Sequence, residues 1–209
     1  MAERQTGGVI DPRFLVLAGL LSIAGIAGYV RDIVRGTTAP NRVTWALWGV
    51  EGLLIFVVEV QQHVGPAAFM TLVFGLIPVV VVVASLPHRH GRWQLGPFDL
   101  VCGAASAVGL ATWALIHDAT AALVAFVVAD QLASLPTVRK AWLAPKSETG
   151  WTYLTGVVNT AVTIMVLHRW TTAGVAFPGA IFVTDLVIWA LVALEVGPRV
   201  RGEVAVAAA

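Results

Sequence analysis

Seven apolar stretches, each about as long as a bilayer-spanning helix, constrain this chain more than any other feature. The hydrocarbon core of a membrane is crossed by roughly 20 consecutive apolar residues in a helix. The sequence has such runs at residues 14–30, 43–61, 66–86, 97–117, 119–138, 150–168 and 173–196. Because the membrane core offers the backbone no other hydrogen-bond partner, each run predicts a helix. The expected fold is an all-α membrane protein with seven transmembrane helices.

The low content of charged residues excludes a soluble globular domain. Hydrophobic residues make up 58% of the 209 positions and Asp, Glu, Lys and Arg only 12%, about half the charged share of soluble domains. The chain has neither a cluster of basic residues nor zinc-spaced cysteines, so we predict no nucleic-acid partner and no metal site. Phosphate-binding loops and hydrolase motifs are also absent. We expect no catalytic residue and no cofactor, with an intramembrane enzyme that uses buried carboxyls as an alternative.

The positions of Lys and Arg predict how the helices are oriented. Three lie on the amino-terminal side of the predicted spans: Arg4, Arg13 and Arg169. Ten lie on the other side: Arg31, Arg35, Arg42, Arg89, Arg92, Arg139, Lys140, Lys146, Arg199 and Arg201. Since cytoplasmic loops carry the excess of basic residues, we expect the amino terminus outside and the carboxyl terminus in the cytoplasm. The excess of Arg over Lys is typical of GC-rich bacteria, so we predict a multi-pass protein of a bacterial inner membrane.

Two of the predicted cytoplasmic loops have similar sequences. Pro40 aligns with Pro145, and Trp45 aligns with Trp151 if one residue is inserted. The first three predicted helices then correspond to the last three, and the fourth is a linker. An odd linker helix makes the two halves parallel, which is a known transporter construction. The predicted organisation is a first three-helix repeat at 11–86, a cytoplasmic loop and linker helix at 87–118, a second three-helix repeat at 119–197 and a disordered tail at 198–209.

The second of these loops resembles the PQ-loop signature, in which Pro-Gln and a basic residue end one helix and Lys-Ser-x-x-Gly opens the next. Here Leu-Pro-Thr-Val-Arg-Lys at 135–140 is followed by Lys-Ser-Glu-Thr-Gly at 146–150. The 3+1+3 helix plan is similar to that of the SWEET sugar transporters and their relatives, including cystinosin-like and nicotinamide riboside transporters. Two positions depart from the pattern: Thr137 replaces the expected Gln, and Arg31 replaces the proline of the first repeat. The resemblance implies a small-solute carrier that works by alternating access.

Prolines in and beside these loops are candidate gating residues. A proline inside a helix removes one hydrogen bond and frees the carbonyl one turn back. Pro136 therefore predicts either a hinge near the cytoplasmic end of its helix or simply the end of that helix. In a carrier, such a hinge would help to close the inner gate. We assign gating to Pro136 and to the two loop prolines, Pro40 and Pro145.

Three carboxyl groups are predicted at one depth near the middle of the membrane. Glu51, Asp130 and Asp185 each fall about midway along a predicted helix, and no Lys or Arg lies inside the predicted spans. An ionised carboxylate in this region is costly, and several close together cannot all be charged. We predict that the three couple transport to ions, each changing protonation with conformation, and that Asp130 and Asp185 face a shared central cavity.

Aromatic and hydrogen-bonding residues accompany these carboxyls at helical spacing. Trp48 precedes Glu51 by three residues, Trp189 follows Asp185 by one turn, and Thr155 and Asn159 lie one turn apart on the predicted sixth helix. A flat aromatic surface beside hydrogen-bonding groups suits a sugar, a nucleoside or a similar small polar solute. The predicted substrate contacts are Asn159, Trp48, Thr155 and Trp189.

Other interpretations of the same residues stay open at this point. Asn, Thr and protonated Asp side chains also fasten helices to one another within a membrane. A non-transporting receptor, scaffold or assembly protein could use the same fold, since a fold does not determine a function. Three carboxyls could instead carry a metal cation or Na⁺. The cargo, the coupling ion and homo-oligomerisation are left open by the sequence.

Overall fold

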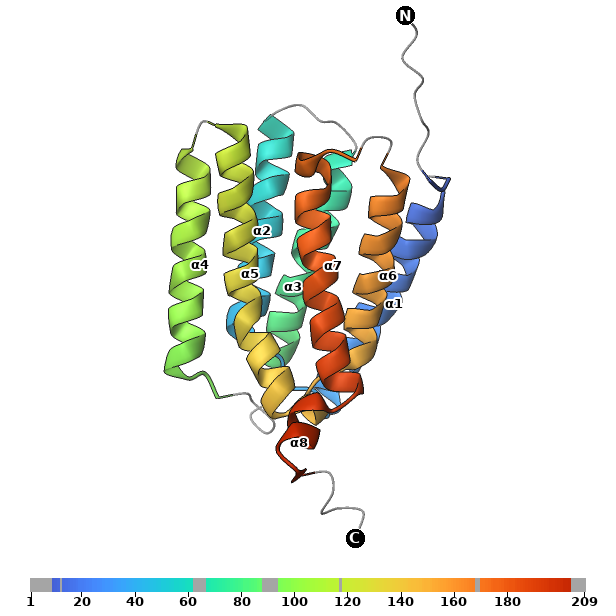
Figure 1. Ribbon diagram of the computed structural model, residues 1–209, viewed down its shortest axis with the longest axis vertical. Helices are drawn as coiled ribbons and strands as arrows, with labels where there is room; N and C mark the ends of the chain where they lie inside the picture. The colour runs from blue at the N-terminus through green and yellow to red at the C-terminus, as the bar shows by residue number, and fades with distance from the viewer. Residues whose placement is uncertain are drawn as a thin grey trace, which may run out of the picture.

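The described part of the chain is entirely helical. The computed structural model describes residues 9–11, 13–61, 67–87, 94–116, 118–167 and 170–203. Their elements, which include no strand, are α1 (Phe14–Val34), α2 (Arg42–Gln61), α3 (Ala67–Ser85), α4 (Pro97–Leu115), α5 (Ala119–Leu143), the 3₁₀ turn η1 (Pro145–Ser147), α6 (Gly150–Val166), α7 (Thr172–Ala193) and α8 (Val196–Val200). The long helices stand side by side in one bundle, with α8 at one end (Figure 1). The all-α prediction is confirmed.

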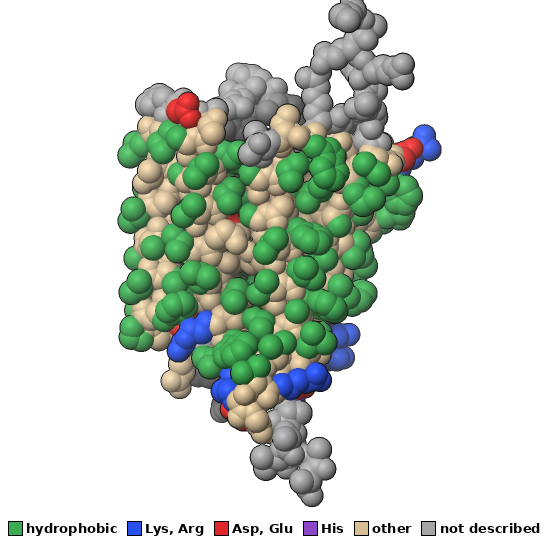
Figure 2. All heavy atoms as spheres, in the orientation of Figure 1, with side chains coloured by type: hydrophobic (Ala, Val, Ile, Leu, Met, Phe, Trp, Pro, Cys, Tyr) green, Lys and Arg blue, Asp and Glu red, His purple; other side chains and the backbone are tan. Residues whose placement is uncertain are grey.

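The surface of this bundle is suited to a membrane. Four helices of the described part are long and apolar enough to cross one: α1, α4, α5 from Thr120 and α7 from Gly174. Hydrophobic side chains cover the visible face along the height of the helices, whereas Lys and Arg gather mainly at the end that carries α8 (Figure 2). We call this end, with the loops at 35–41 and 144–149, the α8 end. The length and composition of these helices are therefore those of a membrane protein.

The contacts within α1–α3 correspond to those within α5–α7, and we call these two groups of helices the first and the second set. In the first set α3 packs against both α1 and α2, and in the second set α7 packs against both α5 and α6. The sets meet along two seams, where α1 packs on α6 and α2 packs on α5. Helix α4 packs on α5 and α2. Residues far apart in the sequence therefore face each other along both seams.

Within the first set, α2 and α3 approach so closely that a side chain would not fit between them. A Cβ atom added at Gly75 would lie 2.8 Å from the backbone carbonyl carbon of Gly52 and 2.9 Å from the backbone nitrogen of Leu53. Small residues permit this kind of contact between membrane helices, where packing rather than the hydrophobic effect drives association. The glycine at 75 is therefore required by the close approach of two backbones.

Helix α5 does not end at its internal proline. Pro136 is buried inside the helix, which continues through Lys140 to Leu143. Of the two alternatives for Pro136, the end of the helix is therefore wrong, and the helix passes through a position where one backbone hydrogen bond is missing. The continuation places Lys140 on a helix rather than in a loop.

The carboxyl-terminal segment differs from the disordered tail expected at 198–209. Residues Val196–Val200 form α8, and Arg201 donates from Nη1 to the carbonyl of Trp142 (3.1 Å) and from Nη2 to that of Leu143 (3.2 Å). These carbonyls belong to the last turn of α5, where the carbonyl groups have no hydrogen-bond donor within the helix. Hydrogen bonds from Arg201 also lower the pKa of the Glu203 carboxyl. The segment is ordered because it caps α5, and residues 204–209 lie outside the described residues.

Candidate functional site

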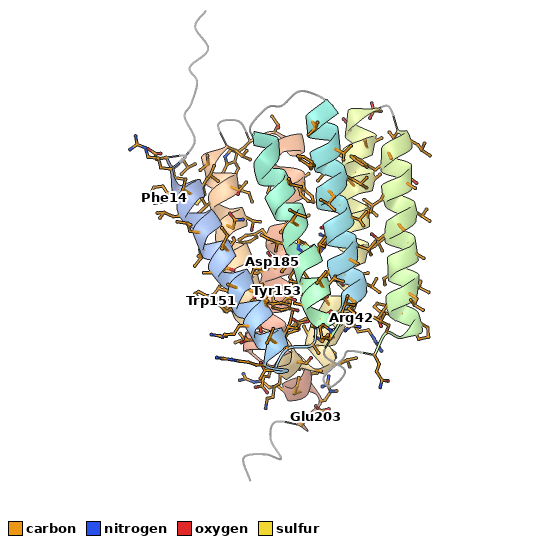
Figure 3. The ribbon with its side chains drawn as sticks, turned by 180° about the vertical axis from the view of Figure 1, so that it is seen from behind. Phe14, Arg42, Trp151, Tyr153, Asp185 and Glu203 are labelled. Atoms are coloured by element: carbon orange, nitrogen blue, oxygen red, sulfur yellow. The ribbon has the colours of Figure 1, made fainter. Side chains whose placement is uncertain are left out.

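The three predicted carboxyls lie together inside the bundle. Glu51 on α2 is 3% exposed and Asp130 on α5 is 5% exposed, and the two carboxyls interact across the seam between the helix sets. Asp185 on α7 is half-buried and interacts with Asp130. It lies at mid-height in the bundle (Figure 3). An added Cβ at Gly156 would lie 2.0 Å from Asp185 Oδ2, so α6 reaches the same place. We call Glu51, Asp130 and Asp185 the acidic cluster.

Hydrogen bonds satisfy only part of this cluster. Asp130 Oδ2 accepts from Gln131 Nε2 (3.0 Å), and Gln131 Oε1 accepts from Thr184 Oγ1 (2.8 Å), which ties α5 to α7. In contrast, Glu51 and Trp48 lie beside the Asp130 carboxyl, but Oε1 of Glu51 and Nε1 of Trp48 are buried and make no hydrogen bond of normal geometry among the described residues. Leaving a buried donor or acceptor unpaired costs about 1–3 kcal/mol. An acceptor and a donor that are not fully satisfied therefore lie on one face of α2, beside Asp130.

An apolar hollow adjoins the acidic cluster on the side away from the α8 end. It has a volume of about 290 Å³ and is lined by Ile55, Trp113, Ala122, Leu123, Phe126 and Phe177. Ile55 follows Glu51 by one turn of α2, and Phe126 precedes Asp130 by one turn of α5. The ring centroids of Trp113 and Phe126 are 5.6 Å apart, and those of Phe126 and Phe177 are 4.9 Å apart. The hollow and the cluster therefore share two helix faces.

The predicted substrate contacts do not all reach this place. Trp48 is half-buried on α2 and interacts with Asp130. Thr155 is buried in the α1–α6 seam, where its Oγ1 donates to the carbonyl of Thr152 (2.7 Å). Asn159 is half-buried one turn further along α6. Trp189 instead packs against the hydrophobic core that includes Ile188, nearer the α8 end. Thus Trp48 and Trp189 both pack against this core, and Trp48 in addition lies beside Asp130.

A second buried polar group, which the sequence did not predict, closes the α8 end. Lys140 Nζ and Glu148 Oε1 form an ion pair at 2.7 Å, and both side chains are 0% exposed. Glu148 Oε2 accepts from the hydroxyls of Tyr29 (2.8 Å) and Tyr153 (3.1 Å), and Trp45 Nε1 donates to the Tyr29 hydroxyl (3.2 Å). Tyr153 is seen below Asp185, toward the α8 end (Figure 3). We call Lys140, Glu148, Tyr29, Tyr153 and Trp45 the Lys140 cluster.

The Lys140 cluster joins the two loops that carry the predicted gating prolines. Lys140 Nζ also donates to the carbonyls of Ala39 and Ser147, one from each loop. The amide of Ala39 donates to the carbonyl of Ser147 (3.0 Å), and the hydroxyl oxygens of Thr38 and Thr149 are 2.6 Å apart. The prolines beside these residues, Pro40 and Pro145, are both buried. The loops of the two helix sets therefore touch and cover the interior at this end.

The position of Lys140, one helical turn after Pro136, is the feature of the sequence that could have revealed this cluster. Lys140 was counted among the exposed loop charges that set the orientation, because α5 was expected to end at Val138. It follows Pro136 by one helical turn, so a helix that passes through the proline turns Lys140 to the same buried face. The partner, Glu148, lies within the segment that resembles a PQ loop. Their pairing depends on the fold of the intervening loop, which the pattern of residues does not specify.

Among the described residues, no group of three or more His, Cys, Asp or Glu side chains could hold a metal ion. Comparison with known proteins finds no matching family model, no matching curated protein and no matching solved structure. The residues of the acidic cluster and of the hollow are therefore the features that indicate a ligand.

Proposed function

We propose that this protein is a small-solute transporter that works by alternating access around a site near the middle of a bacterial inner membrane. One observation carries the proposal. Carboxyls from both helix sets meet inside the bundle, while the buried Lys140 is bound to Glu148 at the α8 end. Ionisable residues at membrane depth are expensive and are kept where they mark a pathway or a binding site. Glu51, Asp130 and Asp185 would couple transport to ions.

The packing supports two parallel repeats joined by α4. Consider a twofold axis along the membrane normal that exchanges α1 with α5 and α2 with α6. The same rotation exchanges the two seams, because α1 packs on α6 and α5 packs on α2. It likewise exchanges α3 with α7, each of which packs against the other two helices of its set. In this proposal α1 to α7 are the seven spans, and the carboxyls lie at the boundary between two units that can rock against each other.

The distribution of charge supports an amino terminus outside and a carboxyl terminus in the cytoplasm. In the described residues, the basic side chains at the α8 end are Arg31, Arg35, Arg42, Arg139, Lys140, Lys146, Arg199 and Arg201, and the opposite end has Arg13. By the positive-inside rule the α8 end faces the cytoplasm. The structure would then be closed to the cytoplasm by the Lys140 cluster, with the apolar hollow on the external side of the carboxyls.

This arrangement assigns the predicted residues to two tasks. Trp48, Thr155 and Asn159 would contact the solute. Trp48 and Trp189 both pack against the core, and Trp189 would stabilise it near the inner gate. Pro136 leaves α5 one hydrogen bond short just before Lys140, so the last turns of α5 can bend. Opening toward the cytoplasm would separate the loops at Pro40 and Pro145 and move Lys140 away from one of its carbonyl partners.

A labelling experiment tests alternating access without knowledge of the solute. Ser134 is 2% exposed and lies one turn beyond Asp130, on the α8 side. In a Cys102→Ala background, we expect Ser134→Cys to react with a membrane-impermeant maleimide added from the α8 side, because the gate opens transiently. Adding Thr38→Cys and Thr149→Cys, oxidised to a disulfide across the loops, should lower this reaction rate by about tenfold or more, because the open state is no longer populated.

The control is a cysteine outside the gate. The side chain of Lys146 is 84% exposed at the same end, so Lys146→Cys should be labelled equally with and without the disulfide. Measurement is by gel shift in membrane vesicles of known orientation. If Ser134→Cys reacts at the same rate in the oxidised and reduced proteins, the gate does not open at the α8 end, and a receptor or scaffold on this fold is the better description.

A further inference from the structure

We propose that the acidic cluster and the adjoining hollow bind an amphipathic organic cation, with a primary ammonium group on a compact aromatic body. The assignment rests on the proposed function, since it names the solute of the same site. It replaces the small polar solute expected from the sequence with one that has an apolar part. Three independent features support it: the sign of the charge, the unpaired polar atoms and the composition of the hollow.

The charge of the site favours a cation. Asp130 interacts with Glu51 on one side and with Asp185 on the other. The buried lysine of the described part cannot compensate them, because Lys140 is bound to Glu148 and to two loop carbonyls. Carboxyls in a region of low dielectric constant must either hold a proton or have a partner of opposite charge. A ligand that brings one positive charge relieves the repulsion between them.

The unpaired atoms favour an ammonium group rather than a metal ion. An ammonium has three N–H donors, and Glu51 Oε1 is a buried acceptor that makes no hydrogen bond of normal geometry among the described residues. Asp130 has one oxygen engaged by Gln131, so the carboxyl has further capacity to accept. The indole of Trp48, an aromatic group of the kind that attracts cations, lies beside Asp130. Since no group that could hold a metal occurs among the described residues, separate directional donors fit this geometry better.

The hollow fits the apolar part of such a ligand. All six residues that line it are apolar, and three of them are aromatic. The hollow has a volume of about 290 Å³ and is partly open, so an aromatic ring could enter it from outside. A sugar would bury its hydroxyls against Phe126, Phe177 and Trp113 without hydrogen bonds, which is unfavourable. A phenyl ring there, one turn from Glu51, would leave an attached ethylammonium within reach of the carboxyls.

The test uses 2-phenylethylammonium as the probe and measures the thermal unfolding midpoint of the full-length protein in lipid nanodiscs. A ligand that binds the folded state raises this midpoint. We expect a saturable rise with 2-phenylethylammonium and none with 2-phenylethanol, 3-phenylpropanoate or methylammonium. The neutral and anionic analogues control for partition into the lipid, and methylammonium tests the charge without the ring. An equal rise with 2-phenylethanol would show a merely apolar site and would overturn the proposal, as would no rise with 2-phenylethylammonium.

Two variants locate the site. Glu51→Gln should weaken binding of 2-phenylethylammonium by about tenfold or more, because it removes one charge partner. Phe126→Ala should weaken it as well but leave methylammonium without effect. Glu203→Gln, which changes an exposed carboxylate in the tail, should bind as the wild type does. If Glu51→Gln does not fold, the wild-type series of four compounds still decides the ligand class.

The labelling and binding experiments test alternating access and the ligand class independently. Binding of 2-phenylethylammonium without gated labelling of Ser134→Cys would support the ligand class and reject transport. Gated labelling without binding would support transport and reject this ligand class.

Discussion

Replacing Glu148 by Gln is expected to lower the free energy of unfolding by about 3–5 kcal/mol, the cost typical of breaking a buried ion pair from one side. The substitution keeps the shape of the side chain but removes the charge that neutralises Lys140, whose side chain is 0% exposed. Two loop carbonyls would remain as partners of Nζ, but they carry no net charge. The measurement is a reversible unfolding titration in mixed micelles, followed by tryptophan fluorescence.

Two further variants separate the ion pair from other effects of the substitution. The exposed pair of Lys146 and Glu195, 3.7 Å apart at the same end, provides a matched control, and Lys146→Gln should be nearly neutral because surface pairs contribute little. The double variant Lys140→Met with Glu148→Gln should recover much of the lost stability, since no unpaired charge is left. If Glu148→Gln alone is as stable as the wild type, the pair does not hold the α8 end together.

Replacing Gly25 by Ala is expected to lower the free energy of unfolding by about 1–3 kcal/mol through overpacking. A Cβ at this position would lie 2.2 Å from Thr155 Oγ1 and 3.1 Å from its Cβ, so α1 and α6 would have to separate. Separation would also stretch the bond from Thr152 Oγ1 to the Gly25 carbonyl, now 3.0 Å. The same unfolding titration measures the loss.

A glycine on the same helix is the control for this substitution. A Cβ at Gly28 would meet no atom within 4 Å, so Gly28→Ala should be neutral or stabilising by up to about 1 kcal/mol, because Ala is the better helix former. Adding Thr155→Ala to Gly25→Ala should restore part of the stability, since it removes the oxygen that the new methyl group would meet. Equal losses for Gly25→Ala and Gly28→Ala would contradict the assignment of Gly25 to a tight seam.

Much of the helix pattern followed from the sequence, because its cause is local. Length and hydrophobicity of a run are properties of neighbouring residues, and they predicted where α2, α4 and α7 lie to within a few residues. The burial of Glu51 and Asp130 could also be inferred, since each lies midway along an apolar run. These features need no knowledge of which helix packs on which.

What the sequence could not provide are the contacts that depend on tertiary packing. The i+4 spacing of Asp185 and Trp189 placed them on one helix face, but it could not show that Asp185 interacts with Asp130 on α5 or that Trp189 packs against the core around Ile188. The Lys140 cluster draws on α1, α2, α5, α6 and the loop before α6, so no local window contains it. The hollow is likewise lined from four helices, and no single helix carries enough of its residues to reveal it.

The Lys140 cluster also sets an order of assembly during synthesis. Tyr29 meets Glu148, 119 positions later in the chain, and the carbonyl of Ala39 meets Lys140, 101 positions later. These contacts cannot form until α5 and the loop before α6 have been synthesised. The end that seals the bundle is thus completed late, and a chain interrupted before residue 148 would be left unsealed.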